Sequence, residues 1–257
     1  MKVVLLAGGF GTRISEETSI RPKPMVEIGG RPILWHIMRW YASHGYNDFV
    51  VCCGYKSEFI RNYFLNYRNS LSDFTINLQS GDTTFHDTEA EDWNVTVVDT
   101  GLNTMTGGRI KAVQQFIGNE PFMLTYGDGV SNVDIHALVE AHKTSGAAAT
   151  LTAVAQVGRF GGLSLDTSGQ VRSFREKAAQ DGAVINGGFF VCEPTVFDYI
   201  DGPDTIWERD PLERLVADGK LNAFRHEGFW QPMDTLRDKN YLEGIWAEGN
   251  APWAPKA

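Results

Sequence analysis

The chain opens on a short apolar run that ends in glycines, and this feature limits its fold more than any other. Residues 2–7 are almost entirely apolar, and Gly8, Gly9 and Gly11 follow directly. A continuous apolar run of this length is typical of a buried parallel strand. Glycines at its carboxyl end let main-chain N–H groups approach a ligand closely. The segment predicts an α/β sheet whose first strand-to-helix turn holds a phosphate.

Strand-like and helix-like segments then alternate along the chain. A helix is expected to begin at Pro32 and to end at Gly45, and further helices are expected at residues 109–116 and 135–142. The strand-like runs lie at residues 49–53, 74–78, 95–98, 122–126 and 149–154. This alternation predicts a doubly wound, mostly parallel, Rossmann-like sheet with helices on both faces.

Beyond residue 158 the strand-like runs become shorter and are separated by turns that contain glycine. They lie at residues 163–165, 171–175 and 189–192, and helices are expected at residues 211–217 and 236–248. We expect small antiparallel additions to the sheet in this half. Because no repeat or low-complexity linker interrupts the chain, residues 1–257 are interpreted as a single domain.

Composition and charge exclude several classes of partner. The formal net charge is -9, and no Lys/Arg run has the length of a nucleic-acid patch. No segment reaches the roughly 18 apolar residues of a membrane span. The cysteines Cys52, Cys53 and Cys192 lie in apolar runs without metal-binding spacing, so buried reduced thiols are expected. We expect a cytoplasmic protein with no nucleic-acid or membrane partner, and any anionic ligand would need a locally positive pocket.

The chemistry begins at LLAGGFGTR, residues 5–13. A dinucleotide fingerprint would need glycine at Ile14, and the Walker pattern is absent. A plain glycine-rich turn is the alternative, but Thr12, Arg13 and, ten residues on, Lys23 add a hydroxyl and two cations. Prolines on both sides of Lys23 restrict its loop. The combination favours a triphosphate ligand whose developing charge these cations would stabilise.

Two aspartates are candidate magnesium ligands. Asp128 follows an apolar strand and is flanked by glycines in TYGDG, which places it at the carboxyl end of that strand, where ligands bind. Asp234 in GFWQPMDT follows aromatic, strand-like residues and precedes a helix. An Asx turn at Asp128 and a helix N-cap at Asp234 are the structural alternatives, and at Asp234 the residues alone leave both interpretations open. Mg²⁺ commonly uses only one or two protein carboxylates.

Together these motifs resemble the bacterial glucose-1-phosphate cytidylyltransferases, a family within the sugar-nucleotide pyrophosphorylases. The resemblance covers nearly the whole chain and keeps the family's order and approximate spacing. It is carried by LLAGGFGTR, PKPMVEIGGRPILWHIM, DTGLNTMTGGR, TYGDG, INGGFF and GFWQPMDTLRDKNYLEG. It implies a nucleotide-binding part at about residues 1–130 and a sugar-phosphate part at about 131–257.

The resemblance also implies roles for individual residues. Those implied for the nucleotide are Leu6, Ala7, Gly8, Gly9, Phe10, Gly11, Thr12, Arg13, Lys23, Thr104, Arg109 and Asp128. Those implied for the sugar phosphate are Glu176, Lys177, Asn186, Gly187 and Gly188. The resemblance places Mg²⁺ on Asp128 and Asp234, and catalysis on Arg13, Lys23, Asp128, Lys177 and Asp234.

The sequence departs from the family at three positions. Arg21 stands where a lysine is usual, Phe10 where an aliphatic residue is usual, and Ala178 where a proline commonly follows the Glu–Lys pair. None of these changes removes a charge that the chemistry requires. Loss of the proline would loosen the loop that binds the sugar phosphate.

The reaction that the resemblance implies is transfer of a cytidylyl group from CTP to glucose 1-phosphate, giving CDP-glucose and pyrophosphate. A phosphate oxygen of the sugar would attack the α-phosphorus directly, with Mg²⁺ and the cations screening the charge. UTP or dTTP in place of CTP, a catalytically silent nucleotide-sugar-binding protein and a dinucleotide-dependent oxidoreductase are the alternatives. The family further implies a homo-oligomer whose product feeds dideoxysugar synthesis for surface polysaccharide such as lipopolysaccharide O-antigen.

Overall fold

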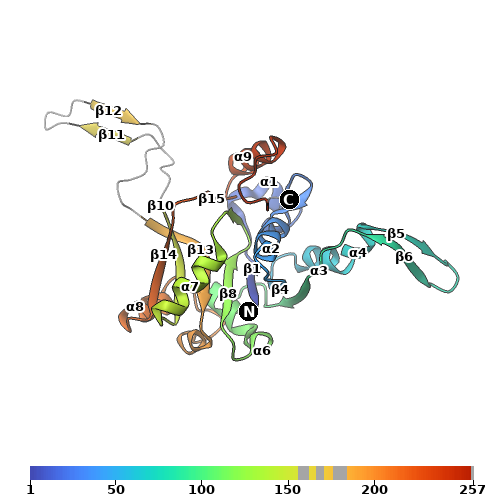
Figure 1. The fold of residues 1–257 in the computed structure, drawn as a ribbon, viewed down its shortest axis with the longest axis horizontal. Coiled ribbons are helices and arrows are strands. Elements are labelled where there is room, and N and C mark those ends of the chain that lie inside the picture. The colour runs from blue at the N-terminus through green and yellow to red at the C-terminus, as the bar shows by residue number, and fades with distance from the viewer. Residues whose placement is uncertain (156–161, 166–170, 176–183, 256–257) are drawn as a thin grey trace.

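A seven-stranded mixed sheet forms the centre of the molecule (Figure 1). The computed structural model describes residues 1–155, 162–165, 171–175 and 184–255. The strands lie in the order β14 (Leu221–His226), β10 (Ala149–Ala155), β13 (Val184–Cys192), β8 (Phe122–Tyr126), β1 (Val3–Ala7), β4 (Asp48–Cys53) and β7 (Asn94–Asp99). Of these strands, β13 alone runs antiparallel to its neighbours. The sheet confirms the doubly wound, mostly parallel fold class.

Helices cover both faces of this sheet because successive side chains of a strand point to opposite sides. Val3 and Leu5 of β1 enter one apolar core, and Val4 enters a second core on the other face. The first core packs α2 (Ile33–Ser43), α3 (Ser57–Leu65), α7 (Ile135–Ser145) and α9 (Leu236–Ala247) against the sheet. The second packs α5 (Thr106–Ala112), α6 (Gln114–Ile117), α8 (Asp210–Ala217) and the 3-10 helix η3 (Pro194–Tyr199).

Short elements line the loops that leave the strands. Pro32 is the N-cap of α2, and Gly45, with a φ of +82°, follows the end of this helix, as the sequence predicts. Three further elements close to the first loop are η1 (Thr12–Ile14), α1 (Ser15–Thr18) and η2 (Lys23–Met25), and α4 (Tyr67–Ser70) follows α3.

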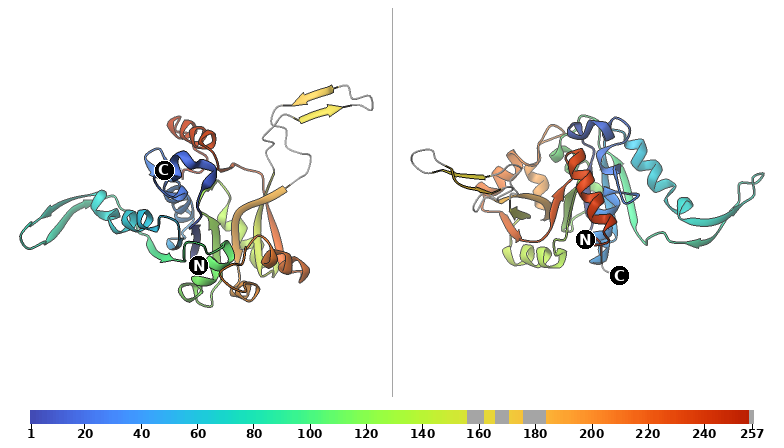
Figure 2. Two further views of the ribbon diagram at one scale, coloured as in Figure 1. Left: turned by 180° about the vertical axis from the view of Figure 1, so that it is seen from behind. Right: turned by 90° about the horizontal axis from the view of Figure 1, so that it is seen from above.

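Four antiparallel pairs lie outside the central sheet. They are β2 (Glu27–Ile28) with β3 (Arg31–Pro32), β5 (Ser72–Ile76) with β6 (Thr83–Thr88), β9 (Gly129–Ser131) with β15 (Trp230–Pro232), and β11 (Gly162–Leu165) with β12 (Val171–Arg175). The pair β11–β12, together with the antiparallel strand β13 of the central sheet, confirms the antiparallel additions expected beyond residue 158. The pair β9–β15 joins a strand before that residue to one after it, and the pairs β2–β3 and β5–β6 lie in the half where none was predicted. The run at residues 74–78 does form a strand, but that strand, β5, belongs to a hairpin that projects from the body instead of joining the alternation (Figures 1 and 2).

All three cysteines are buried free thiols, as the sequence predicts. Burial raises the pKa of the Cys53 thiol to about 12 and raises the pKa of Cys52 and Cys192 as well, so these thiols stay protonated. Among the helices that the structure describes, none has the length and apolar character needed to cross a bilayer.

Candidate active site

The carboxyl ends of β1, β4, β7 and β8 meet at one edge of the sheet, because these four strands are parallel. The loops that leave these ends carry most of the residues that the sequence singles out. Ligands in open α/β sheets bind at this edge. We therefore take these loops as the candidate site.

The glycines after β1 differ in what they permit. A Cβ at Gly8 would lie 2.3 Å from Nη1 of Arg109, and Gly11 has a φ of +64°, so both positions need glycine in the fold itself. At Gly9, by contrast, a Cβ would meet nothing within 4 Å. Phe10 beside it is exposed and its ring contacts Tyr55. The loop is thus tightly packed on one side and open to solvent on the other.

Arg109 of α5 fastens the ends of three strands together. Its guanidinium donates to the carbonyl of Gly8, which follows β1, and to the carbonyl of Cys53, which ends β4, at 3.1 Å each. After β7 it donates to Thr100 Oγ1 at 2.7 Å, and its remaining bonds reach the carbonyls of Gly101 and Leu102. Burial lowers the pKa of this guanidinium, which nevertheless remains charged because arginine starts from so high a value. The described bonds of Arg109 thus run to four main-chain carbonyls and one hydroxyl around the loop.

Lys23 lies between the two candidate aspartates. Its Nζ is 2.7 Å from Asp128 Oδ2 and 2.8 Å from Asp234 Oδ1, and only 6% of the lysine is exposed. The 3-10 turn η2 holds the lysine, with Met25 N–H donating to the carbonyl of Pro22. The sequence singled out these three charged residues separately, and the structure brings them into one cluster.

Pairing of β9 with β15 places the two aspartates side by side. Asp128 precedes β9, Asp234 follows β15, and Gly129 is opposite Pro232 in the register. The N–H of Met233 donates to the carbonyl of Asp128 at 2.8 Å and closes this arrangement. The N-cap alternative for Asp234 is wrong, because Thr235 caps α9 in a capping box with Asp238. The carboxylate of Asp234 instead contacts Lys23.

Asn186, Gly187 and Gly188 belong to strand β13, where its register against β10 shifts, and we call these three residues the β13 bulge. The bulge lies beside the same strand ends, since Phe189 is opposite Thr125 of β8 in the register. Asn186 Nδ2 donates to the hydroxyl of Tyr126, and its Oδ1 accepts from the N–H of Gly188 at 2.8 Å. Trp230 Nε1 donates to the carbonyl of Gly187 at 2.7 Å, so the bulge is held by contacts with both Tyr126 and Trp230.

Sequence reasoning missed two residues here: Trp230, which bonds the β13 bulge, and Glu208, which bonds Tyr126. Trp230 stands inside a quoted motif but was given no role, and Glu208 accepts a hydrogen bond from Tyr126 across 82 positions of sequence. A contact of that span leaves no local pattern. Glu176 and Lys177 lie outside the described residues, as does the side chain of Arg13.

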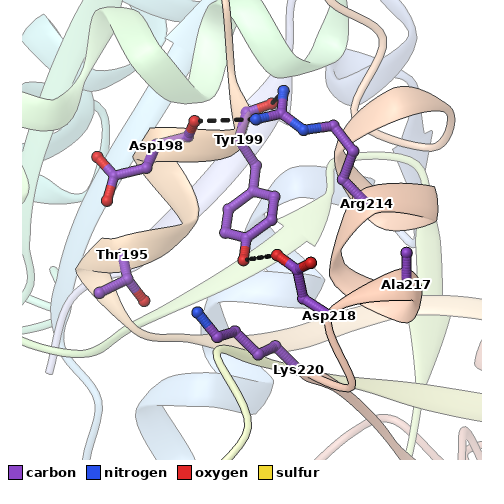
Figure 3. Close-up of a pocket in the computed structure, with 7 residues that line it drawn as sticks. All are labelled: Thr195, Asp198, Tyr199, Arg214, Ala217, Asp218 and Lys220. Atoms are coloured by element: carbon purple, nitrogen blue, oxygen red, sulfur yellow. Dashed lines mark hydrogen bonds between the residues drawn. The ribbon is translucent and has the colours of Figure 1, made fainter.

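A hollow lies away from these loops, between η3 and α8 (Figure 3). Its volume is about 410 Å³. Its polar groups bond to one another: the Tyr199 hydroxyl donates to Asp218 at 2.6 Å, and Arg214 donates to the carbonyls of Tyr199 and Asp198. These bonds join η3 to α8, and we interpret the hollow as part of that packing and not as the candidate site.

Comparison with known proteins identifies the family of the chain. The family model described as "Nucleotidyl transferase" matches residues 2–238. The glucose-1-phosphate cytidylyltransferase of Salmonella typhi is 57% identical over 254 residues, which cover 98% of each chain. A probable glucose-1-phosphate cytidylyltransferase of Bacillus subtilis is 44% identical, over 98% of this chain and 99% of the relative.

A solved structure shares the fold at a lower identity. The crystal structure of HddC from Yersinia pseudotuberculosis superposes with a TM-score of 0.71 at 22% identity, over 95% of this chain and 99% of that one. At such an identity the likeness concerns the fold alone. With the family match over most of its length, the chain belongs to the nucleotidyl transferase family and is an enzyme of that family.

Proposed function

We propose that the chain transfers the cytidylyl group of CTP to glucose 1-phosphate, forming CDP-glucose and pyrophosphate. The observation that carries the proposal is the ammonium of Lys23 held between Asp128 and Asp234, at the strand ends where this fold binds ligands. The relatives from Salmonella typhi and Bacillus subtilis are a glucose-1-phosphate cytidylyltransferase and a probable one, which supports CTP as nucleotide and glucose 1-phosphate as acceptor.

The nucleotide is proposed to lie over the loop after β1. The open space at Gly9 would admit a phosphate close to the main chain, whereas packing at Gly8 and Gly11 fixes the loop's shape. Thr104 lies against Gly101 at the neighbouring strand end. We assign Arg109 to the support of this loop, since its described bonds fasten the carbonyls below it. The full proposed nucleotide set remains Leu6, Ala7, Gly8, Gly9, Phe10, Gly11, Thr12, Arg13, Lys23, Thr104, Arg109 and Asp128, in which Arg109 acts through the loop and not as a direct ligand.

A divalent cation fits the Lys23 cluster, because both carboxylates already converge on one positive charge. Among the described residues, no group of three or more His, Cys, Asp or Glu side chains gathers as a metal site. Two carboxylates suffice for Mg²⁺, which takes its other ligands from phosphates and water. We propose that Asp128 and Asp234 hold Mg²⁺, which when bound supplies positive charge to the reacting phosphates.

Lys23 would then change partners. An ammonium that lies 2.7 and 2.8 Å from the two carboxylates occupies the space between them and opposes a second cation there. The triphosphate offers Lys23 a new anionic partner. We infer that Lys23 releases the carboxylates when the nucleotide arrives, and that its charge is then used on the phosphates.

The acceptor is proposed to bind beside the β13 bulge formed by Asn186, Gly187 and Gly188, with Glu176 and Lys177 near its phosphate. Its phosphate oxygen attacks the α-phosphorus of CTP and forms the new P–O bond. The bond from the α-phosphorus to the bridging oxygen breaks, and pyrophosphate leaves with the electron pair. The attacking phosphate is already deprotonated near neutral pH, so the main barrier is repulsion between anions, which Arg13, Lys23 and Lys177 would screen.

We also propose a cytoplasmic homo-oligomer of one domain, divided near residue 130 into nucleotide and sugar-phosphate parts. The β5–β6 hairpin supports self-association, because it projects from the body with apolar side chains exposed (Figures 1 and 2). Phe74 and Ile76 are about half exposed there, and Leu78 at the tip is 90% exposed. Apolar surface of this kind on a projecting arm typically contacts a partner.

The test is release of pyrophosphate from glucose 1-phosphate and Mg²⁺, with CTP, UTP, dTTP, ATP and GTP offered separately. A preference for CTP that EDTA abolishes is the expected result. Release with UTP or dTTP would keep the reaction and replace the nucleotide. Nucleotide-sugar binding without release from any of them would favour the silent binding protein.

A further inference from the structure

A chain of hydrogen bonds joins the two sides of the candidate site through Glu208. The hydroxyl of Tyr126 donates to Glu208 Oε1 at 2.6 Å, and the hydroxyl of Thr106 donates to Glu208 Oε2 at 2.6 Å. Asn186 Nδ2 in turn donates to the Tyr126 hydroxyl at 3.1 Å. Thr106 begins α5 beside the proposed nucleotide loop, and Asn186 belongs to the β13 bulge, which we propose binds the sugar. The Glu208 carboxylate is the point at which the two sides meet.

Each link of this chain has only one possible direction. The main-chain N–H of Gly188 can only donate, so the Asn186 atom 2.8 Å away is the amide oxygen, and the amide nitrogen faces Tyr126. The Tyr126 oxygen must therefore accept from Asn186, and its own hydrogen must point elsewhere. A carboxylate only accepts, and Glu208 takes that hydrogen.

The β13 bulge also contacts the ring of Tyr126. Gly188 has a φ of +80°, and a Cβ there would lie 2.5 Å from Tyr126 Cδ2, so the bulge and the ring are in direct contact. The hydroxyl at the far end of the same ring accepts a hydrogen bond from the Asn186 amide. A change in the position of Tyr126 would therefore move both the main chain of the bulge and the side chain of Asn186.

The geometry points to Glu208 as a positioning residue for the sugar site, which acts through Tyr126 to fix the amide of Asn186 toward the acceptor. This inference rests on the proposed function, since it assigns the β13 bulge at Asn186 to the sugar. Glu208 itself is exposed, whereas Tyr126, which donates to it, and Asn186, which donates to Tyr126, are half-buried. We infer no contact between Glu208 and the reacting atoms.

The effect should fall on the acceptor and not on the nucleotide. The start of α5 has other bonds besides the one between Thr106 and Glu208. The N–H of Met105 donates to the carbonyl of Pro203, that of Gly108 to the carbonyl of Thr205, and that of Trp207 to the hydroxyl of Thr106. Asn186, by contrast, depends on Tyr126 for the one described bond of its amide nitrogen.

The first test compares Glu208→Ala with wild type in steady-state kinetics. We expect KM for glucose 1-phosphate to rise about three- to tenfold, the effect of losing one charge-assisted hydrogen bond, with KM for CTP unchanged. Glu208→Gln should show a smaller rise, because its amide oxygen can still accept from Tyr126. The matched control is Glu213→Ala, an exposed glutamate on α8, which should leave both constants unchanged.

The second test is a double-mutant cycle with Tyr126→Phe, which removes the hydroxyl and keeps the ring against Gly188. If Glu208 acts through that hydroxyl, Glu208→Ala adds no further rise in KM to the Tyr126→Phe variant. A full additional rise would overturn the inference, and so would an unchanged KM for the acceptor in Glu208→Ala. Thermal melting establishes that each variant is folded. Failure of wild type to release pyrophosphate with any nucleotide would instead refute the proposed function.

Discussion

Arg109 and Lys23 are two buried cations at the same edge of the sheet, and they differ in what surrounds them. Their exposed fractions are nearly equal, 5% and 6%, so burial does not separate them. The hydrogen bonds described for Arg109 reach carbonyls and one hydroxyl, all of them neutral, whereas Lys23 lies between two carboxylates. Neutral acceptors fixed in strand ends hold a cation permanently. Paired carboxylates can exchange one cation for another, so we assign Arg109 to architecture and Lys23 to chemistry.

The largest effect that separates the two cations is expected from Lys23→Met. Turnover should fall about 100- to 1000-fold, because a positive charge that stabilises the transferring phosphoryl group is lost. Methionine is similar in length to lysine, so the variant should fold. The control is Lys143→Met on the exposed face of α7, with turnover as in wild type. Pyrophosphate release by a folded Lys23→Met protein at the wild-type rate would show that Lys23 has no chemical role.

Arg109→Lys should behave in the opposite way. An ammonium cannot bond all the acceptors that the guanidinium reaches, so buried carbonyls would lose their partners. We expect the free energy of unfolding in denaturant to fall by about 3 kcal/mol, with turnover per folded molecule much less affected. If stability stayed at the wild-type level and KM for CTP rose steeply, Arg109 would be a direct nucleotide ligand instead.

His36 is a third buried basic side chain, and unlike Arg109 and Lys23 it is neutral in the folded protein. Its Nε2 bonds to the carbonyl of Ile28, and Trp253 donates to its Nδ1, so the ring is neutral. Burial first, and then the charges of Arg39 and Arg31, lowers the pKa of His36 to about 4. The unfolded chain binds this proton near pH 6.5.

Stability from His36 is therefore present above about pH 6.5 and is lost as the pH falls toward 4. Between pH 6.5 and 5 the free energy of unfolding should decrease by roughly 2 kcal/mol. The same measurement on His36→Gln should give a shallower slope over this interval. Equal slopes for the two proteins would mean that His36 is not the titrating group.

The smallest effect should come from adjacent glycines that touch different neighbours. Gly8→Ala would press a methyl group against the guanidinium of Arg109 and should lower the free energy of unfolding by about 1–2 kcal/mol. Gly9→Ala has open space and should stay within about 0.5 kcal/mol of wild type while raising KM for CTP. Equal destabilisation by both changes would contradict the division between a packed and an open side of the loop.

Sequence reasoning found residues that are marked by their local surroundings. These residues lie in loops that leave strands. They are the glycines after β1, Lys23 between its prolines, and Asp128 and Asp234 after strand-like residues. The alternation of segments predicts that such loops meet at one edge of the sheet. For that reason the fold class and the three charged residues could be predicted, whereas the contacts of Lys23 with both carboxylates came from the structure. The choice between N-cap and cluster at Asp234 needed the structure, which assigns the cap to Thr235.

Features that depend on distant partners could not be predicted. The period of residues 74–78 indicates a strand but not its neighbour, so the projecting hairpin was mistaken for part of the alternation. Edge strand β14 was missed, because its mixed sequence, LNAFRH, lacks both the apolar run and clean alternation. Glu208 is an exposed glutamate in the sequence, and only its contact with Tyr126 gives it a role.

The most direct test of the account concerns Lys23 as the cation that occupies the space between Asp128 and Asp234 until the substrate arrives. We would titrate Mn²⁺, observed by electron paramagnetic resonance, into wild type and Lys23→Met without nucleotide. We expect the dissociation constant for Mn²⁺ to be about tenfold lower, or lower still, in Lys23→Met than in wild type, because the competing ammonium is gone. Addition of CTP should narrow the difference, since it draws Lys23 away in wild type. Equal or weaker Mn²⁺ binding by the variant without nucleotide would contradict the account.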